Sequence, residues 1–153
     1  DASDSAEAER AAEVGFEGDR ADQDVADFEL AQELAAVEAA RAVLAFLAAE
    51  PDLARLCLVE SQSAGPAVAA RFHDAVREAV PFLELGRAER ERDRPLPDST
   101  EESVIGALVS LAGRKVAAGE AAHLEDLLPD CVEFILSPYL GAEEGSRLAR
   151  EAA

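Results

Sequence analysis

The chain contains few residues whose type and spacing could support catalysis or metal binding. Its two histidines, His73 and His123, lie fifty positions apart, and neither has a histidine or cysteine four positions away. Helical metal sites commonly place two ligands at that spacing. The sequence also lacks a phosphate-binding glycine loop, a Gly-x-Ser-x-Gly elbow and a Cys-x-x-Cys pair. We therefore predict no enzymatic activity, no cofactor and no metal site.

The remaining reactive side chains each have a structural explanation beside a functional one. His73 follows Phe72 in an apolar helical pattern, where it is either a satisfied, partly buried residue or a contact to a ligand. His123 falls in a turn and is expected at the surface or at a helix cap. Cys57 and Cys131 fall in apolar helical patterns, as buried thiols do. Two cysteines without a disulfide framework are typical of reduced thiols, so we expect a cytoplasmic protein.

Length, composition and charge limit the class of protein. The 153 residues suffice for one domain with its own core, and the 34 alanines favour helix. Acidic residues outnumber basic ones by 33 to 14, and the net charge of −19 argues against nucleic-acid binding by this chain itself. No run of 18 apolar residues occurs, so we predict no membrane-spanning helix and no membrane partner.

The charge is unevenly distributed, and this suggests where the folded domain begins. Residues 1–50 carry a net charge of −11, and the first 23 residues hold two glycines and few large apolar side chains. Such a composition does not bury enough apolar surface to order itself. We therefore expect an acidic, poorly ordered segment over 1–23 and a helical domain over 24–153.

Prolines and helical periodicity predict the first three helices. Over 28–50 the apolar positions step by three and four residues, which is one face of a helix. Arg41 falls on this face, where it either pairs with an acid such as Glu38 or Glu60 or places a charge at the edge of a pocket. The next helices are expected over 51–61 and 66–85, each opened by a proline, and Pro81 should kink the second of them.

A charged linker is expected over 86–98, followed by a helix over about 103–118. Ser99 or Thr100 could cap this helix through its side chain. Gly106 and Gly113 lie within it and would permit close approach of another helix.

The most apolar stretch, 124–140, is predicted to be a helix with large apolar side chains around nearly its whole circumference. Few other elements are available to surround it, so we expect a second copy of the chain to supply the cover. Gly141 ends this helix, and residues 142–151 should form a short polar helix.

Four motifs in this order resemble the C-terminal regulatory domain of TetR-family transcriptional regulators of the actinobacterial type. They are FLAAEPDLARLCLVE at 46–60, Gly65-Pro66 opening a long helix, AGEAAHLEDLLP at 118–129, and PYLGAEE at 138–144. The likeness covers residues 28–148. It implies an all-α homodimer of about five to six helices whose last two long helices form an intersubunit four-helix bundle. It also implies an effector-binding cavity among the preceding helices.

The resemblance implies that a small hydrophobic effector in this cavity weakens operator binding, as in a repressor. The N-terminal helix-turn-helix head of the family is not legible in the first 27 residues, which are too acidic and too few. DNA contact is therefore expected only through a head that is missing from this chain. The alternative is a headless helical dimer that acts as a protein–protein interaction module, and an apolar cavity would discriminate against it.

Mapped onto this sequence, the family pattern implies two sets of site residues. The candidate effector-binding residues are Val37, Arg41, Leu44, Leu56, Gln62, Phe72, His73, Val76, Val80 and Leu108. Arg41, Gln62 or His73 would supply the polar contact. The candidate dimer-interface residues are Ile105, Leu108, Ala112, Val132, Phe134, Ile135 and Tyr139.

Overall fold

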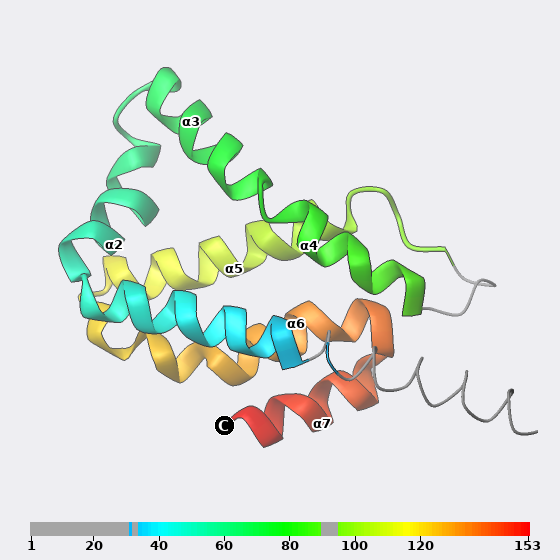
Figure 1. Ribbon diagram of the computed structural model, residues 1–153. Coiled ribbons are helices and arrows are strands. Elements are labelled where there is room, and N and C mark those ends of the chain that lie inside the picture. Colours follow the sequence, from blue (N-terminus) through cyan, green and yellow to red (C-terminus); the bar gives the residue numbers. More distant parts are fainter. Residues whose placement is uncertain (1–30, 32–33, 90–94) are drawn as a thin grey trace, which may run out of the picture. The chain divides into compact units, whose positions relative to one another are not determined.

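The computed structural model describes residues 31, 34–89 and 95–153 (Figure 1). The chain divides into two units, Asp1–Leu34 and Ala35–Ala153, and the features below belong to the second. Within the described ranges the secondary structure is helical and contains no strand, which confirms the all-α prediction. The predicted acidic segment 1–23, its boundary with the helical domain, and the start of the predicted helix over 28–50 lie outside the described residues.

The first half of this unit is a series of short helices that largely follow the predicted ranges. A helix at 34–49 precedes α2 (Pro51–Leu58), the 3-10 turn η1 (Glu60–Gln62), α3 (Pro66–Arg77), α4 (Val80–Glu84) and the 3-10 segment η2 (Leu85–Glu89). Pro51 and Pro66 occupy the first turns of α2 and α3, as expected. A proline suits that position because its missing N–H would have no helical partner there.

The prediction of one kinked helix over 66–85 is wrong. α3 ends at Arg77, and a turn at Glu78 and Ala79 separates it from α4. Pro81 lies in the first turn of α4 and so starts a new helix instead of bending an old one. This arrangement avoids the clash and the lost hydrogen bond that a proline causes inside a helix.

The second half of the unit contains the longest helix and most of the core. It consists of α5 (Thr100–Ala117), the 3-10 segment η3 (Ala121–Leu127), α6 (Leu128–Leu140) and α7 (Ala142–Ala152). The predicted helix over 124–140 therefore begins with a 3-10 segment, and Pro129 opens its α-helical part. The short terminal helix is confirmed, and Gly141, with φ of 92°, makes the turn between α6 and α7.

The helix α6 finds most of its cover within its own protomer. Its neighbours are α5, α7, η2 and η3. The core cluster contains Leu44, Ala54, Val104, Ala112, Val116, Ala121, Leu124, Leu127, Leu128, Cys131, Val132, Ile135, Leu136 and Ala149. Among the large apolar residues of α6, Phe134 stands apart because it is 51% exposed. The expectation that this helix lacks cover inside the chain therefore holds only at Phe134.

Close helix contacts explain two of the glycines. A Cβ on Gly113 of α5 would lie 3.3 Å from the backbone oxygen of Leu58, so this glycine allows α2 to approach, as predicted. Gly106 has no atom within 4 Å of the same position and lies on an exposed face. A Cβ on Gly145 of α7 would lie 3.0 Å from the Cα and backbone nitrogen of Ser137 in α6. This contact seats α7 closely against α6.

The predicted side-chain cap of α5 is not formed. Ser99 occupies the N-cap position without a side-chain hydrogen bond to the helix. The Thr100 hydroxyl donates to the backbone oxygen of Pro97 at 2.7 Å instead. The start of α5 is held by a different group, Glu101, described below.

Candidate functional site: an apolar hollow beneath α3

The helix α3 has an apolar face that does not join the core. Phe72 and Val76 lie one turn apart on α3 and are half-buried, and none of the twelve residues of this helix is buried. Among the described residues, the core cluster and the side chains packed on it come from the helix at 34–49, α2, α4, α5, η3, α6 and α7, but not from α3. The helix contacts mainly η1 and α5. The rest of the unit therefore covers the apolar face of α3 only partly.

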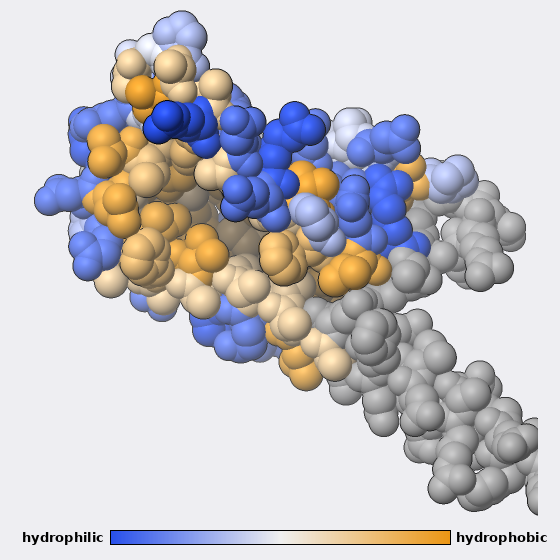
Figure 2. All heavy atoms as spheres, turned by 45° about the horizontal axis from the view of Figure 1, so that its top comes forward, coloured by the Kyte–Doolittle hydropathy of each residue, from blue (hydrophilic) through white to orange (hydrophobic). Residues whose placement is uncertain are grey.

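Figure 2 shows a hollow at this place. It is bordered by α3 and α4 along its upper edge, by α2 on the left and by the helix at 34–49 below, and apolar side chains gather on the last two. Large apolar residues of these border helices are exposed to an unusual degree: Val43 57%, Phe46 56%, Leu53 36%, Leu56 55% and Val68 43%. A concave, mostly apolar surface with few polar groups is the usual form of a small-molecule site.

Part of the predicted effector set lies on the helices that border this hollow and on the turn η1 that precedes α3. Phe72, Val76 and Val80 are half-buried along α3 and the start of α4, and Leu56 is exposed on α2. His73 is exposed beside Phe72, with the two rings edge to face at a centroid distance of 6.2 Å. Gln62 is exposed in η1. His73 and Gln62 are thus the polar side chains of the set that the border elements carry.

The other predicted effector residues belong to the core or pack on it, or form other contacts. Leu44 is a buried core residue, and Val37 and Leu108 are half-buried and pack on the core. Arg41 is directed to α7: its Nη2 donates to the backbone oxygen of Ala152 at 3.3 Å, and its Nε lies 3.7 Å from Glu38 Oε1. The ion-pair explanation of Arg41 is therefore confirmed. A cation beside a C-terminal helix carbonyl also complements the helix dipole.

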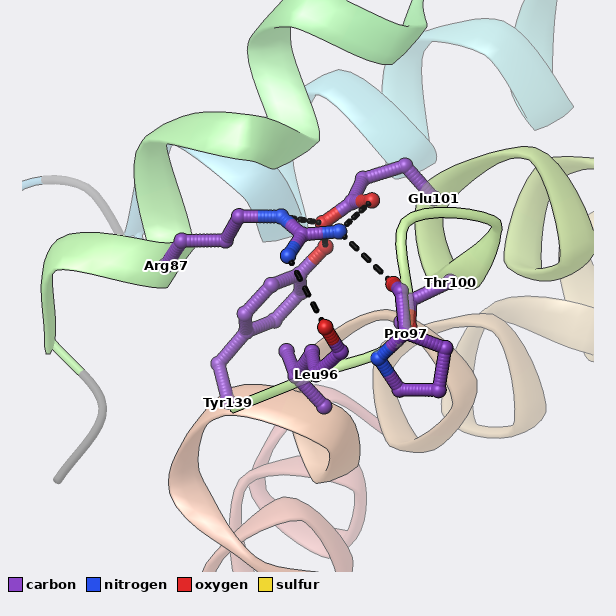
Figure 3. Close-up of polar contacts among 6 residues, drawn as sticks. All are labelled: Arg87, Leu96, Pro97, Thr100, Glu101 and Tyr139. Atoms are coloured by element: carbon purple, nitrogen blue, oxygen red, sulfur yellow. Dashed lines mark hydrogen bonds and ion pairs between the residues drawn. The ribbon is translucent and has the colours of Figure 1, made fainter. Parts of the chain in front are cut away.

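A second polar cluster, which we call the clamp, consists of Arg87, Glu101 and Tyr139 (Figure 3). The Arg87 guanidinium donates from Nε to Glu101 Oε1 at 2.8 Å and from Nη2 to Oε2 at 2.6 Å. The Tyr139 hydroxyl donates to Oε1 at 3.1 Å. Arg87 also donates to the backbone oxygens of Leu96 at 3.3 Å and Pro97 at 2.9 Å. The clamp thus joins η2, the segment before α5, α5 itself and α6.

The clamp keeps a fully buried carboxylate charged. Glu101 is 1% exposed, and burial alone would raise the pKa of its carboxyl. The hydrogen bonds from Arg87, its own backbone and Tyr139 outweigh burial, so the pKa lies below its ordinary value. Burial and the bond to Glu101 raise the pKa of the Tyr139 phenol, which stays protonated and able to donate. Because both charges of the clamp have partners, it has the features of a contact that stabilises the fold.

The sequence gives little sign of the clamp. Arg87 lies in the stretch that predicts an exposed charged linker, its partner Glu101 is 14 positions away, and Tyr139 lies a further 38 positions along the chain. The one local hint is Gly86. A Cβ at this position would lie 2.9 Å from Tyr139 Cγ, so the absence of a side chain lets the backbone of η2 pack on the tyrosine ring.

The predicted dimer-interface residues are mostly covered within the protomer. Ile105, Ala112, Val132, Ile135 and Tyr139 are each 8% exposed or less, and Leu108 is half-buried. Phe134 is the member of the set that presents a large apolar side chain to the surface. The interface as a whole stays a prediction. Within this set, Phe134 alone offers a partner subunit a large apolar side chain that its own protomer leaves exposed.

No described part of the chain offers a metal site, since no three His, Cys, Asp or Glu side chains lie close enough together to hold an ion. Among the described helices none is both long and apolar enough to cross a membrane.

Comparison with protein families, with curated proteins and with solved structures finds no match to this chain.

Proposed function

We propose that this chain is the regulatory domain of a TetR-like transcriptional regulator and that it binds a small hydrophobic effector in the hollow beneath α3. The observation that carries the proposal is the apolar face of α3, which is half-buried and yet lies outside the core. The sequence resemblance implies an effector cavity among these same helices. DNA binding would belong to the helix-turn-helix head that the resemblance implies for the family.

An effector in the hollow would complete the packing that α3 lacks. Phe72 is already half-buried, so completing its cover contributes only part of the roughly 1.5–3 kcal/mol of full burial, and the effector gains the same kind of burial on its own surface. His73 and Gln62 can give it one oriented polar contact. The effector regulates only as far as it binds one arrangement of α3 better than another, because that difference in affinity is the coupling free energy.

The same proposal includes a homodimer in the cytoplasm. Phe134, 51% exposed on α6, supports a subunit contact at this helix, in line with the intersubunit four-helix bundle of the family. The two cysteines are both free, which supports a reducing compartment.

Phe134→Arg is expected to convert the dimer to a monomer in analytical ultracentrifugation. An unchanged dimer would exclude this residue from the interface.

Titration with Nile red, a neutral apolar dye whose emission shifts to the blue when it leaves water, tests the effector site. The wild-type chain is expected to bind one dye per protomer. Val76→Arg places a charge on the inner face of α3 and should weaken binding by at least about tenfold, because burying an unpaired charge is costly.

Ala70→Arg is the matched control, since Ala70 is exposed on the same helix about half a turn away from the line of Phe72 and Val76. It should leave the dye affinity unchanged. Equal weakening by both variants, or no binding by the wild type, would refute the effector site.

The exposed side chains of Phe82 and Leu85, 75% and 56% accessible, favour a second candidate function. They form an apolar surface on α4 and η2 that a helical interaction module could present to a protein partner. This candidate would stand in place of the first if the hollow binds no apolar molecule and Phe82→Ser abolishes association with a partner.

A further inference from the structure

The segment formed by α3 and α4 is attached to its unit at its two ends and along α5, which both helices contact. At the near end, Gly65 has φ of 105°, a left-handed conformation that favours glycine, and it forms the N-cap of α3. The preceding turn η1 is fixed, because buried Ser61 donates through its hydroxyl to the backbone oxygen of Cys57. At the far end, η2 follows α4 directly, and its residue Arg87 is bonded to Glu101 in the clamp.

Between these two ends the segment has a natural joint. At Glu78 and Ala79 the regular α-helical bonding gives way to a turn, in which Glu78 N lies 3.3 Å from the oxygens of both Asp74 and Ala75 and Ala79 N lies 3.2 Å from that of Val76. On one side of the joint, α3 has no residue in the core. On the other side, Leu83 of α4 packs on the core and α4 contacts α5.

We infer that α3 is a strap that opens and closes over the hollow, pivoting at Gly65 and at the Glu78–Ala79 joint, while the clamp holds α4 and η2 in place. The amount of buried apolar surface sets the free energy of local opening, and α3 contributes no residue to the core. The inference rests on the proposed function only for the identity of what enters. The motion itself follows from the packing of α3 and its two attachments.

With this arrangement, a molecule can enter the hollow without a loss in the free energy of unfolding of the whole unit. Opening of α3 breaks its contacts with η1 and α5 but removes no residue from the core, so α5, α6 and α7 stay packed on one another while a molecule enters. The clamp limits the motion to the residues before the joint. Loosening the clamp should extend the motion across α4 and η2, whose amides are otherwise expected to exchange slowly.

Hydrogen–deuterium exchange of the full chain, with and without Nile red, tests the inference. The amides of α3 are expected to exchange about 100-fold faster than those of α5, while η2 stays protected. Saturating dye should slow exchange in α3. Equal protection of α3 and α5, or equally fast exchange of α3 and η2, would overturn the strap.

Two conservative variants test the role of the clamp: Glu101→Gln neutralises the carboxylate that pairs with Arg87, and Tyr139→Phe removes a single hydrogen bond. Glu101→Gln and Tyr139→Phe should each raise exchange in η2 and α4 by about tenfold, corresponding to the loss of a charge-assisted or single hydrogen bond. Arg147→Ala is the control, because Arg147 pairs with Glu144 and Glu151 on the exposed face of α7. It should not change exchange in η2.

The outcomes separate the strap from the effector site. Fast exchange of α3 that Nile red does not slow would support the strap and contradict the proposed function. Unchanged exchange of η2 in both clamp variants would overturn the assignment of the clamp as the fixed end.

Discussion

The helices α6 and α3 have nearly equal lengths, thirteen and twelve residues, and both begin with a proline in the first turn, yet they are packed very differently. α6 buries six residues between its neighbours, whereas α3 buries none. Helix α6 has apolar side chains around most of its circumference, and α3 has them along one narrow face. The difference shows that a well-formed helix in this protein need not belong to the core. Helix α3, which lies outside the core, borders the hollow.

The strongest test of this contrast removes the buried carboxylate of the clamp. Glu101→Ala should lower the free energy of unfolding by about 3 kcal/mol, because Arg87 and Tyr139 lose their common acceptor in a buried site. Urea denaturation monitored by circular dichroism measures the change. Arg147→Ala, which breaks exposed ion pairs of α7, should leave the urea midpoint unchanged. A Glu101→Ala variant as stable as the wild type would mean that the clamp contributes nothing.

The reactivity of the two cysteines allows a chemical comparison of α6, which carries Cys131, with α2, which carries Cys57. Cys131 is buried in α6, and burial, with the nearby Asp130 charge, raises its pKa from 9.0 to about 11. Its thiolate fraction at pH 8 is therefore about 100-fold below that of an ordinary thiol. Cys57, half-buried on α2 at the border of the hollow, should react with a disulfide reagent first. Mass mapping of the modified cysteine checks the order, and equal rates in the folded chain would contradict it.

Two glycines provide a matched pair of substitutions. Gly145→Ala forces a Cβ against Ser137 in the α6–α7 contact and should cost about 2 kcal/mol by overpacking. Gly106→Ala fills open space on the surface of α5 and should stabilise the chain by about 0.5–1 kcal/mol through helix propensity. Thermal unfolding of both variants measures the difference. Changes of the same sign would show that the close approach of α7 is not what requires Gly145.

The smallest effect is in the acid dependence of stability. The pKa of Glu101 is lower in the folded chain than its ordinary value of 4.5, so its contribution is complete above that value and is lost as the pH falls through the folded pKa. The stability difference between wild type and Glu101→Gln should therefore be constant near neutral pH and shrink below about pH 4.5. A difference that is independent of pH down to about 3 would show that the carboxyl is not held charged.

Much of the fold follows from local features of the sequence. The prolines Pro51 and Pro66 open helices because a proline needs no helical hydrogen-bond partner at the first turn. Periodicity predicts the apolar faces, and the role of Gly113 in a close helix contact is also foreseen. The same local rules fail at Pro81, since they cannot distinguish a kinked helix from two helices that meet at a turn.

The site is only partly predictable because it depends on contacts between distant residues. Phe72 and Val76 are identified by their helical spacing, but the same spacing predicts core residues equally well at Leu44. Arg41 is correctly paired with Glu38, which is three positions away, whereas its contact with α7 is 111 positions away. Glu101 and Tyr139 are coupled through a long-range hydrogen bond that no local pattern indicates.

The proposed binding site beneath α3 is tested most directly by a nuclear Overhauser measurement on methyl-labelled chain saturated with an apolar ligand such as Nile red. We predict contacts from the ligand to the methyl groups of Val76 on α3 and Leu56 on α2. Contacts confined to Leu85 on η2 or to the surface around Phe134, with none to Val76 or Leu56, would contradict a binding site beneath α3.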